Sequence, residues 1–268
     1  MSADSAGARG EAVSRPAWEA ILGNLPPEAT NALWREYSDA LTARLLEDWI
    51  GPRRFGRVLK TDAYDEALGR GAVQPLAGRA DALILMDWSV LALRRASAGR
   101  SGVRAVACDV RALPFAAESF DLIFSASTLD HLPGPADIED ALRALGRALR
   151  AGGRLILTLD NPSNPVVRLR NALPPTWLRR LRLTPYPVGA TLGAAQIARL
   201  LERAGLKPVR WDFLCHCPRL PAVNLCRLAG NNRFAGRLVR ALLAFEQLRH
   251  WPTRRLTGYY TAVEALKP

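Results

Sequence analysis

The sequence predicts an α/β protein built around a mostly parallel sheet. Short apolar runs alternate with helical segments from Gly51 onward, and this alternation is typical of crossover units that place successive strands in parallel. Some runs, such as ALILMD, are apolar almost throughout, which indicates strands buried on both faces. Two runs end in acidic residues, Asp87 and Asp109. Because open α/β sheets bind ligands at the carboxyl ends of their strands, these residues mark a candidate ligand site.

Seven strands can be assigned in this alternating region, with helices between them. We expect the strands at residues 57–62, 81–87, 104–109, 120–127, 153–159, 208–214 and 259–266. We expect the helices near residues 63–69, 89–98, 135–149 and 193–204.

The N-terminal segment has a different pattern. Residues 1–15 are mostly small and polar, and we expect them to form a disordered tail. Residues 16–50 carry apolar side chains at helical spacing on both sides of Pro26-Pro27, which predicts an N-terminal cap of two or three helices. Such a cap either covers a ligand cleft or packs on the sheet, and the pattern is compatible with both.

The main domain is predicted to span residues 51–268 and to contain two basic insertions. They lie at about residues 164–189 and 218–257, where the alternation of strands and helices is interrupted. In the second insertion, leucines at helical spacing predict a helix near residues 234–248, with Phe245 on its apolar face.

Positive charge is concentrated in the C-terminal half of the chain. The formal net charge is +12, yet residues 1–139 contain 15 Lys/Arg and 19 Asp/Glu, whereas residues 140–268 contain 22 and 6. A GC-rich genome accounts for part of the arginine excess, because the chain is also rich in Ala, Gly and Pro. The remaining excess predicts contact with nucleic acid, an anionic membrane surface or an acidic substrate.

Apolar run lengths and cysteine spacing point to a cytoplasmic protein. No early apolar stretch has the length of a signal-peptide core, and no run reaches the roughly 18 residues of a membrane span. The four cysteines form no spaced framework, so we expect no disulfides. In Cys215-His216-Cys217, strand alternation would place His216 on the face opposite both cysteines, and we therefore predict no metal site.

Three segments together resemble a known enzyme family. In chain order they are LILMDWSVLALRRA, ACDVRALPFAAESFDLIFSASTLDHL and LRAGGRLILTLDNPSNP. They are similar to the class I S-adenosylmethionine-dependent methyltransferases, especially the small-molecule group, in which strand four reads FDLI and a GG-R-L turn leads into strand five. The resemblance covers about residues 56–160, and the strand pattern extends it to the C-terminus. It implies a Rossmann-like seven-stranded sheet with helices on both faces, with S-adenosylmethionine as the cofactor.

The resemblance also implies roles for residues at the strand ends. Asp87 would accept hydrogen bonds from both ribose hydroxyls, and Trp88 would pack on the adenine face. Asp109 would accept from the exocyclic amine of adenine, while the backbone N–H of Val110 donates to a ring nitrogen. Ser127 would lie beside the methionine moiety. Either aspartate alone could instead cap a helix, but two at the matching spacing favour the cofactor.

The turn after strand one departs from the family pattern. The family has an acidic residue and then a glycine-rich turn, because glycine lets the backbone approach the cofactor closely. Here Lys60 stands where the acid is expected, and residues 61–66 replace the glycines. We expect Asp62 to take the ammonium of the cofactor's amino-acid end, and Thr61 or Tyr64 its carboxylate. The alternative is a silent scaffold that no longer binds the cofactor and acts as a binding module.

His131, in the segment STLDHL after strand four, is the candidate catalytic residue. In methyl transfer the sulfonium carries the driving force, so the protein supplies alignment and, for a hydroxyl acceptor, a base. Asp130 lies beside His131 in the sequence. The competing interpretation is a histidine that caps or packs against the following helix.

The predicted reaction is methyl transfer to an O or N atom of a small organic acceptor. DNA base methylation is not expected, because STLD stands where DNA amino-methyltransferases have an Asn/Asp-Pro-Pro-aromatic motif. A structured-RNA methyltransferase is a further alternative. The basic stretch at residues 168–182, which includes Trp177, forms either a solvated lid over the pocket or a peripheral contact with an anionic membrane.

Overall fold

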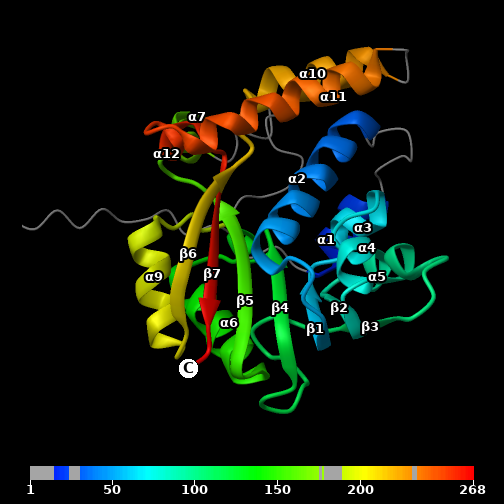
Figure 1. Ribbon diagram of the computed structural model, residues 1–268, viewed down its shortest axis with the longest axis vertical. Coiled ribbons are helices and arrows are strands. Elements are labelled where there is room, and N and C mark those ends of the chain that lie inside the picture. The colour runs from blue at the N-terminus through cyan, green and yellow to red at the C-terminus, as the bar shows by residue number, and fades with distance from the viewer. Residues whose placement is uncertain (1–14, 24–30, 175–176, 178–188, 231–233) are drawn as a thin grey trace, which may run out of the picture.

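The computed structural model describes residues 15–23, 31–174, 177, 189–230 and 234–268. Within these residues the chain forms one seven-stranded sheet with helices on both faces, in the order β3-β2-β1-β4-β5-β7-β6 (Figure 1). The predicted fold class is therefore confirmed. The strands are β1 (Phe55–Thr61), β2 (Ala80–Asp87), β3 (Val103–Ala107), β4 (Phe120–Ala126), β5 (Leu149–Asp160), β6 (Lys207–Leu214) and β7 (Tyr260–Leu266).

The direction of the strands places a crevice at the centre of the sheet. β1 pairs in parallel with both β2 and β4, so the chain leaves β1 toward one edge and returns to build the other. Ligands bind outside the carboxyl ends of the strands at such a switch point. Only β7 runs antiparallel among the described strands, and it pairs with β5 and β6.

The helices on one face of the sheet are α6 (Pro135–Ala148) and α9 (Ala194–Arg203). α6 begins with Pro135 in its first turn, where the missing N–H has no helical partner to lose. Its buried residues Ile138, Ala141, Leu142 and Leu145 recur at i, i+3, i+4 and i+7, which is the spacing of one helical face. This face forms a continuous core with β4 and β5.

The opposite face is covered by α2 (Ala32–Ile50), α4 (Val73–Ala77) and α5 (Val90–Ser97). Ser89 caps α5, because its hydroxyl accepts from the N–H of Ala92 at 3.1 Å. Two short helices, α1 (Arg15–Gly23) and α3 (Tyr64–Leu68), lie beside α5. Helices thus occur on both sides of Pro26-Pro27, while the predicted disordered tail falls, except for Arg15, on residues that the structure does not describe.

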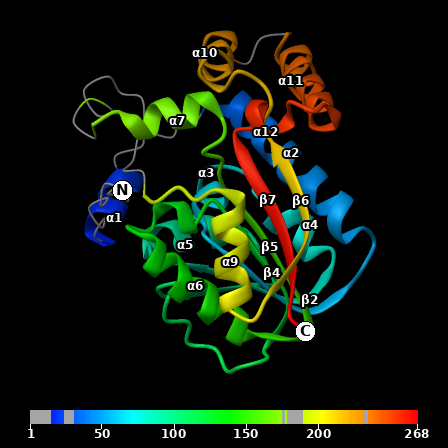
Figure 2. The ribbon, with the colours of Figure 1, turned by 90° about the vertical axis from the view of Figure 1, so that its left-hand side faces the viewer.

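The C-terminal half contributes helices at the end of the molecule toward which the parallel strands point (Figures 1 and 2). They are α7 (Pro165–Ala172), α10 (Arg219–Ala229), α11 (Ala235–Ala244), the 3-10 helix η3 (Phe245–His250) and α12 (Arg254–Thr257). The helix expected near residues 234–248 is α11 continued by η3. The predicted apolar face is wrong at Phe245, which is 41% exposed, because the chain tightens into a 3-10 helix there.

The N-terminal half of α2 packs against α10 and α11 rather than against the sheet. Leu33, Trp34 and Tyr37 form a separate core with Cys226 of α10 and Leu242 of α11. α2 therefore joins the sheet to the C-terminal helices. In the part of the chain that the structure describes, no helix combines the length and apolarity that crossing a membrane requires.

Candidate functional site

A pocket opens at the carboxyl ends of β1 to β4. It lies where the strand order reverses, as expected for a ligand site in an open α/β sheet. Seven of its lining residues are predicted site residues: Asp62, Tyr64, Asp87, Trp88, Asp109, Val110 and His131. The other lining residues are Met86, Ser89, Cys108, Arg111, Thr128, Leu132 and Pro133.

The turn after β1 is made by Asp62 instead of glycine. Asp62 has a φ of 72°, in the left-handed region that glycine favours and that Asp tolerates better than most residues. Its Oδ1 accepts from the N–H of Tyr64 at 2.6 Å, which holds this conformation from the side chain. Burial raises the pKa of Asp62 well above its usual value. The chain therefore makes this turn without glycine, and Asp62 adds a carboxyl group to the pocket wall.

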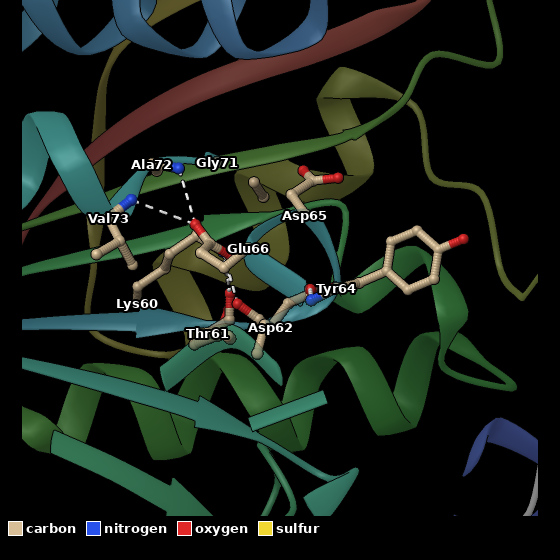
Figure 3. A network of polar contacts seen from close by, with 12 residues as sticks. Lys60, Thr61, Asp62, Tyr64, Asp65, Glu66, Gly71, Ala72 and Val73 are labelled. Carbon is tan, nitrogen blue, oxygen red and sulfur yellow. Dashed lines mark hydrogen bonds and ion pairs between the residues drawn. The ribbon is translucent and has the colours of Figure 1, made fainter. Parts of the chain in front are cut away.

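A buried ion pair contacts this turn (Figure 3). Lys60 and Glu66 are almost completely buried, and Nζ of Lys60 lies 2.8 Å from Oε2 of Glu66. The ammonium also donates to the carbonyl of Asp62 at 2.5 Å. Burial lowers the pKa of Lys60, but the charges of Glu66 and of nearby aspartates outweigh burial, so the pKa of Lys60 is raised and the ammonium stays charged.

The other oxygen of Glu66 closes the loop that follows. Oε1 accepts from the N–H of Ala72 at 2.8 Å and of Val73 at 3.3 Å (Figure 3). Gly71 packs directly over this carboxylate with a φ of 58°, and a Cβ there would collide with Glu66. Glycine is thus required at Gly71 because a side chain, rather than a cofactor, lies against the backbone.

Asp87 lies at the end of β2 with its carboxylate in the pocket. Oδ2 accepts from the N–H of Ala63 and Oδ1 from the N–H of Ser89, each at 2.7 Å. A carboxylate oxygen has two lone pairs, so each oxygen retains one acceptor position. Burial raises the pKa of Asp87. The capping alternative is wrong here, because Ser89 is the N-cap of α5.

Asp109 is held by an arginine that the sequence interpretation missed. Nη2 of Arg111 lies 2.7 Å from Oδ2 of Asp109, and Nη1 lies 2.6 Å from Oδ1 of Asp137 at the start of α6. Burial raises the pKa of Asp109, but the hydrogen bonds from Arg111 outweigh burial and hold it below its usual value. In the sequence, the signal for this ion pair was the arginine two residues after Asp109. In the described chain no helix begins between Asp109 and β4, so Asp109 caps none.

Two predicted cofactor residues lie outside this first pocket. Thr61 is fully buried, and its hydroxyl is hydrogen-bonded to those of Ser125 at 2.8 Å and Thr128 at 2.9 Å. Ser127 lines the neighbouring pocket instead, with a φ of 48°. Thr128, next in the chain, lines the first pocket.

A second pocket adjoins the first. Asp62, Tyr64 and His131 line both pockets, and so mark their junction. The ring of Tyr64 points away from the Lys60–Glu66 pair, as Figure 3 shows. The remaining wall comes from α2, the ends of β4 and β5, the start of β7 and the segment between β6 and α10. Its aromatic and basic residues include Trp34, Arg35, Arg219 and Tyr260, and Ser127 and Cys215 line it as well.

Glu246 of η3 ties the wall of the second pocket together. Its Oε1 accepts from the hydroxyl of Tyr37 in α2 and from the N–H of His216, both at 2.9 Å. Its Oε2 accepts from the N–H of Cys215 at 3.2 Å. The His216 ring is occupied elsewhere, 2.7 Å from Oγ1 of Thr257, so it faces away from this pocket. One buried carboxylate thus joins three segments that are distant in the sequence.

His131 ends the 3-10 turn Leu129–His131 (η2), directly after the buried Asp130. Asp130 is only 4% exposed, and its Oδ1 has no hydrogen-bond partner among the residues that the structure describes. Burial, and then the charge of Asp160, raise the pKa of Asp130 to about 8. Asp160 itself is paired with Arg170 of α7 at 2.6 Å. A carboxyl group that is protonated at neutral pH therefore lies next to the candidate base.

The stability of the protein is expected to fall as pH rises because of Asp130. The folded state binds this proton more tightly than the unfolded chain, where an Asp has a pKa of about 3.9. The contribution of this proton to the free energy of unfolding is fully present below about pH 4 and is lost as pH rises through 8. Over this interval the free energy of unfolding should fall by on the order of 5 kcal/mol. Asp130→Asn should flatten this dependence in urea unfolding between pH 5 and 8.5. Asp140→Asn, at an exposed site on α6, is the control, and equal slopes for Asp130→Asn and the parent would contradict the assignment.

The sheet order and the strand-end carboxylates define an α/β enzyme that binds a nucleoside-bearing cofactor at the switch point. Comparison with known proteins identifies the family. The family described as "Methyltransferase domain" matches residues 65–157. A demethylmenaquinone methyltransferase from Thermobifida fusca is 30% identical over 196 residues, which cover 62% of this chain and 80% of that protein. The chain therefore belongs to the class I S-adenosylmethionine-dependent methyltransferases, and S-adenosylmethionine is its cofactor.

Two further similarities agree with this family. A malonyl-[acyl-carrier protein] O-methyltransferase from Enterobacter lignolyticus is 31% identical over 149 residues, which cover 54% of each chain. The N-methyltransferase NodS from Bradyrhizobium japonicum, solved in complex with S-adenosyl-L-homocysteine, has a TM-score of 0.56 at 16% identity, covering 93% of this chain and 98% of that one. The second similarity concerns the fold alone.

Proposed function

We propose that the protein transfers the methyl group of S-adenosylmethionine to an O or N atom of a small organic acceptor bound in the second pocket. The observation that carries this proposal is the junction of the two pockets at Asp62, Tyr64 and His131. A donor in the first pocket and an acceptor in the second would meet there, which is the alignment that an in-line displacement needs.

The first pocket has groups suited to adenosine. We assign the two ribose hydroxyls to Asp87, whose oxygens each keep an acceptor position beyond their backbone contacts. Trp88, which lines the pocket and is 37% exposed, offers its indole to the adenine face. Asp109 and the N–H of Val110 are assigned to the adenine edge, with Arg111 orienting the carboxylate of Asp109.

The amino-acid end of the cofactor is assigned to the turn after β1. Asp62 places a carboxyl group at the junction, where it would pair with the ammonium, and pairing of this kind would favour its ionised form. Tyr64 lines both pockets and has a phenol that could donate to the carboxylate. We exclude Thr61 because its hydroxyl is buried and engaged, and we assign Ser127 to the acceptor side.

The sulfonium of the bound cofactor supplies the driving force, so the chain has two tasks. It must exclude water and orient the acceptor, for which the aromatic wall of Trp34, Tyr64 and Tyr260 is suited. It must also remove a proton from a hydroxyl acceptor, and His131 at the junction is the base that we assign. Similarity to a malonyl-[acyl-carrier protein] O-methyltransferase supports an oxygen acceptor.

Replacing His131 with glutamine should separate catalysis from cofactor binding. For a hydroxyl acceptor we expect kcat to fall by about 10²–10⁴-fold and its pH profile to change, because the base that takes the proton is removed. Affinity for S-adenosylhomocysteine should change little. The assay would use deuterated-methyl S-adenosylmethionine with a panel of phenols, carboxylic acids and amines, and mass spectrometry of the products.

Two results would count against the proposal. Product NMR that places the new methyl group on carbon would overturn the O or N assignment. Unchanged kcat and pH profile in His131→Gln would remove His131 from the reaction, even if methyl transfer itself is observed.

A further inference from the structure

The C-terminal helices form one connected surface beside the mouth of the second pocket. α10 begins at Arg219, which lines that pocket. Asn164, the N-cap of α7, donates to the carbonyls of Leu256 and Thr257 in α12, both at 3.1 Å. Figures 1 and 2 agree in placing α7, α10, α11 and α12 at the same end of the molecule. We call the exposed residues of these four helices, together with Phe234 and the exposed residues that link α11 to α12, the apical surface.

Large apolar side chains are exposed on this surface. On α10, Ala222 and Cys226 are buried, whereas Leu220, Leu225 and Leu228 are 48%, 51% and 84% exposed. Further exposed apolar residues on the same surface are Val166, Leu169, Phe234, Trp251 and Leu256. Gathered exposed apolar residues on a folded protein typically mark an interaction site rather than a solvated face.

The charge of the same region has one sign. The helices α7, α10, α11 and α12 together contain eight arginines and no acidic residue. Arg227, Arg237 and Arg240 of α10 and α11 are exposed. The apolar residues are therefore accompanied by cations that have no acidic neighbour in these stretches of sequence.

We propose that the apical surface docks on an anionic lipid bilayer. Arginines attract acidic headgroups, while exposed leucine and tryptophan side chains enter the boundary between headgroups and acyl chains. A nucleic acid would account for the arginines but leaves Leu225 and Leu228 in water. Because the second pocket opens beside this surface, docking would let a lipid-dissolved acceptor enter without crossing water. That last step rests on the proposed methyl transfer, whereas docking itself does not.

The test is flotation of the full-length chain with vesicles of phosphatidylcholine alone or mixed with phosphatidylglycerol. We expect the protein to float with the mixed vesicles at low salt, to be released as salt rises, and to bind phosphatidylcholine alone weakly. Arg227→Glu/Arg240→Glu should weaken binding at least about tenfold, because two cations that attract the acidic headgroups become anions. The vesicle binding that remains at high salt should be weaker for Leu228→Asn than for the parent.

Matched controls lie on exposed sites away from the apical surface. Arg94→Glu/Arg199→Glu, on α5 and α9, makes the same change in net charge, and Val209→Asn, on β6, removes one exposed apolar side chain. Both controls should bind like the parent. Calorimetry with S-adenosylhomocysteine on every variant shows whether the cofactor site is intact, so loss of docking is distinguished from loss of the proposed activity.

Three outcomes would overturn the docking proposal. The first is failure of the parent to float with mixed vesicles at low salt. The second is equal loss of binding in the apical variants and their controls, because binding would then depend on the net charge of the protein and not on the apical surface. The third is tight, salt-dependent binding of a structured RNA that Arg227→Glu/Arg240→Glu abolishes while vesicles are not bound.

Discussion

Lys60→Met is expected to lower the free energy of unfolding by about 3–5 kcal/mol, because it leaves the carboxylate of Glu66 buried without its cation. The carboxylate would keep its two backbone donors, Ala72 and Val73, but these carry only partial charge. The carbonyl of Asp62 would also lose the ammonium as a donor. Urea unfolding at neutral pH measures the effect. Since the turn at Asp62 rests on this pair, affinity for S-adenosylhomocysteine should fall as well.

A double-mutant cycle separates the ion pair from simple loss of packing. Glu66→Gln keeps an oxygen for the N–H of Ala72 and removes the charge, so Lys60→Met/Glu66→Gln should recover much of the stability lost in Lys60→Met. Arg54→Met is the control: Arg54 and Asp81 lie 2.9 Å apart but their side chains are 66% and 69% exposed, and the cost should be below about 1 kcal/mol. Additive effects of the two buried substitutions would show that Lys60 and Glu66 are not coupled.

Asp87→Ala is expected to weaken S-adenosylhomocysteine binding by about 100-fold or more. Each hydrogen bond from a ribose hydroxyl to a shielded carboxylate contributes roughly 1.5–3 kcal/mol, and the substitution removes two. Isothermal titration calorimetry measures the loss directly. The variant also leaves the N–H groups of Ala63 and Ser89 without their acceptor, so the midpoint of thermal unfolding must be measured beside the affinity.

The same strand supplies the matched control for this substitution. Asp81 lies at the opposite end of β2, exposed to solvent, and Asp81→Ala should leave the affinity unchanged. Asp87→Asn should be intermediate, because one side-chain oxygen remains as an acceptor. If Asp87→Ala binds S-adenosylhomocysteine as tightly as the parent while remaining folded, Asp87 does not hold the ribose, and the adenosine end of the site must be reassigned.

The fold could be predicted closely because its signals are local. Each buried strand is an apolar run bounded by turn residues, and most predicted strand ends lie within two residues of those in the structure. β5 is the exception: it begins at Leu149, which the apolar spacing assigned to the preceding helix. α4, with the sequence VQPLA, was missed because a central proline and five residues carry no helical periodicity.

The candidate site could be predicted only in part, because side-chain direction at a strand end is set by tertiary contacts. Thr61 and Ser127 stand at the expected positions in the chain, yet one is turned into the interior and the other toward the second pocket. Arg111 and Glu66 were not assigned a role, since each acts through a partner that the loop brings close. Lys60 was visible as a departure from the family pattern, but only the structure shows which charge it neutralises.

The shared carboxylate of Glu246 has a consequence for how acceptor specificity can change during evolution. α2, the segment after β6 and η3 meet at this one group, although they come from opposite ends of the chain. Losing any of the three would leave the other two with unsatisfied buried polar groups and an uncovered apolar face. We therefore expect α2 and the C-terminal insertion to be gained, lost or exchanged together among relatives. Such an exchange would change the acceptor pocket, while the residues that bind the cofactor stay the same.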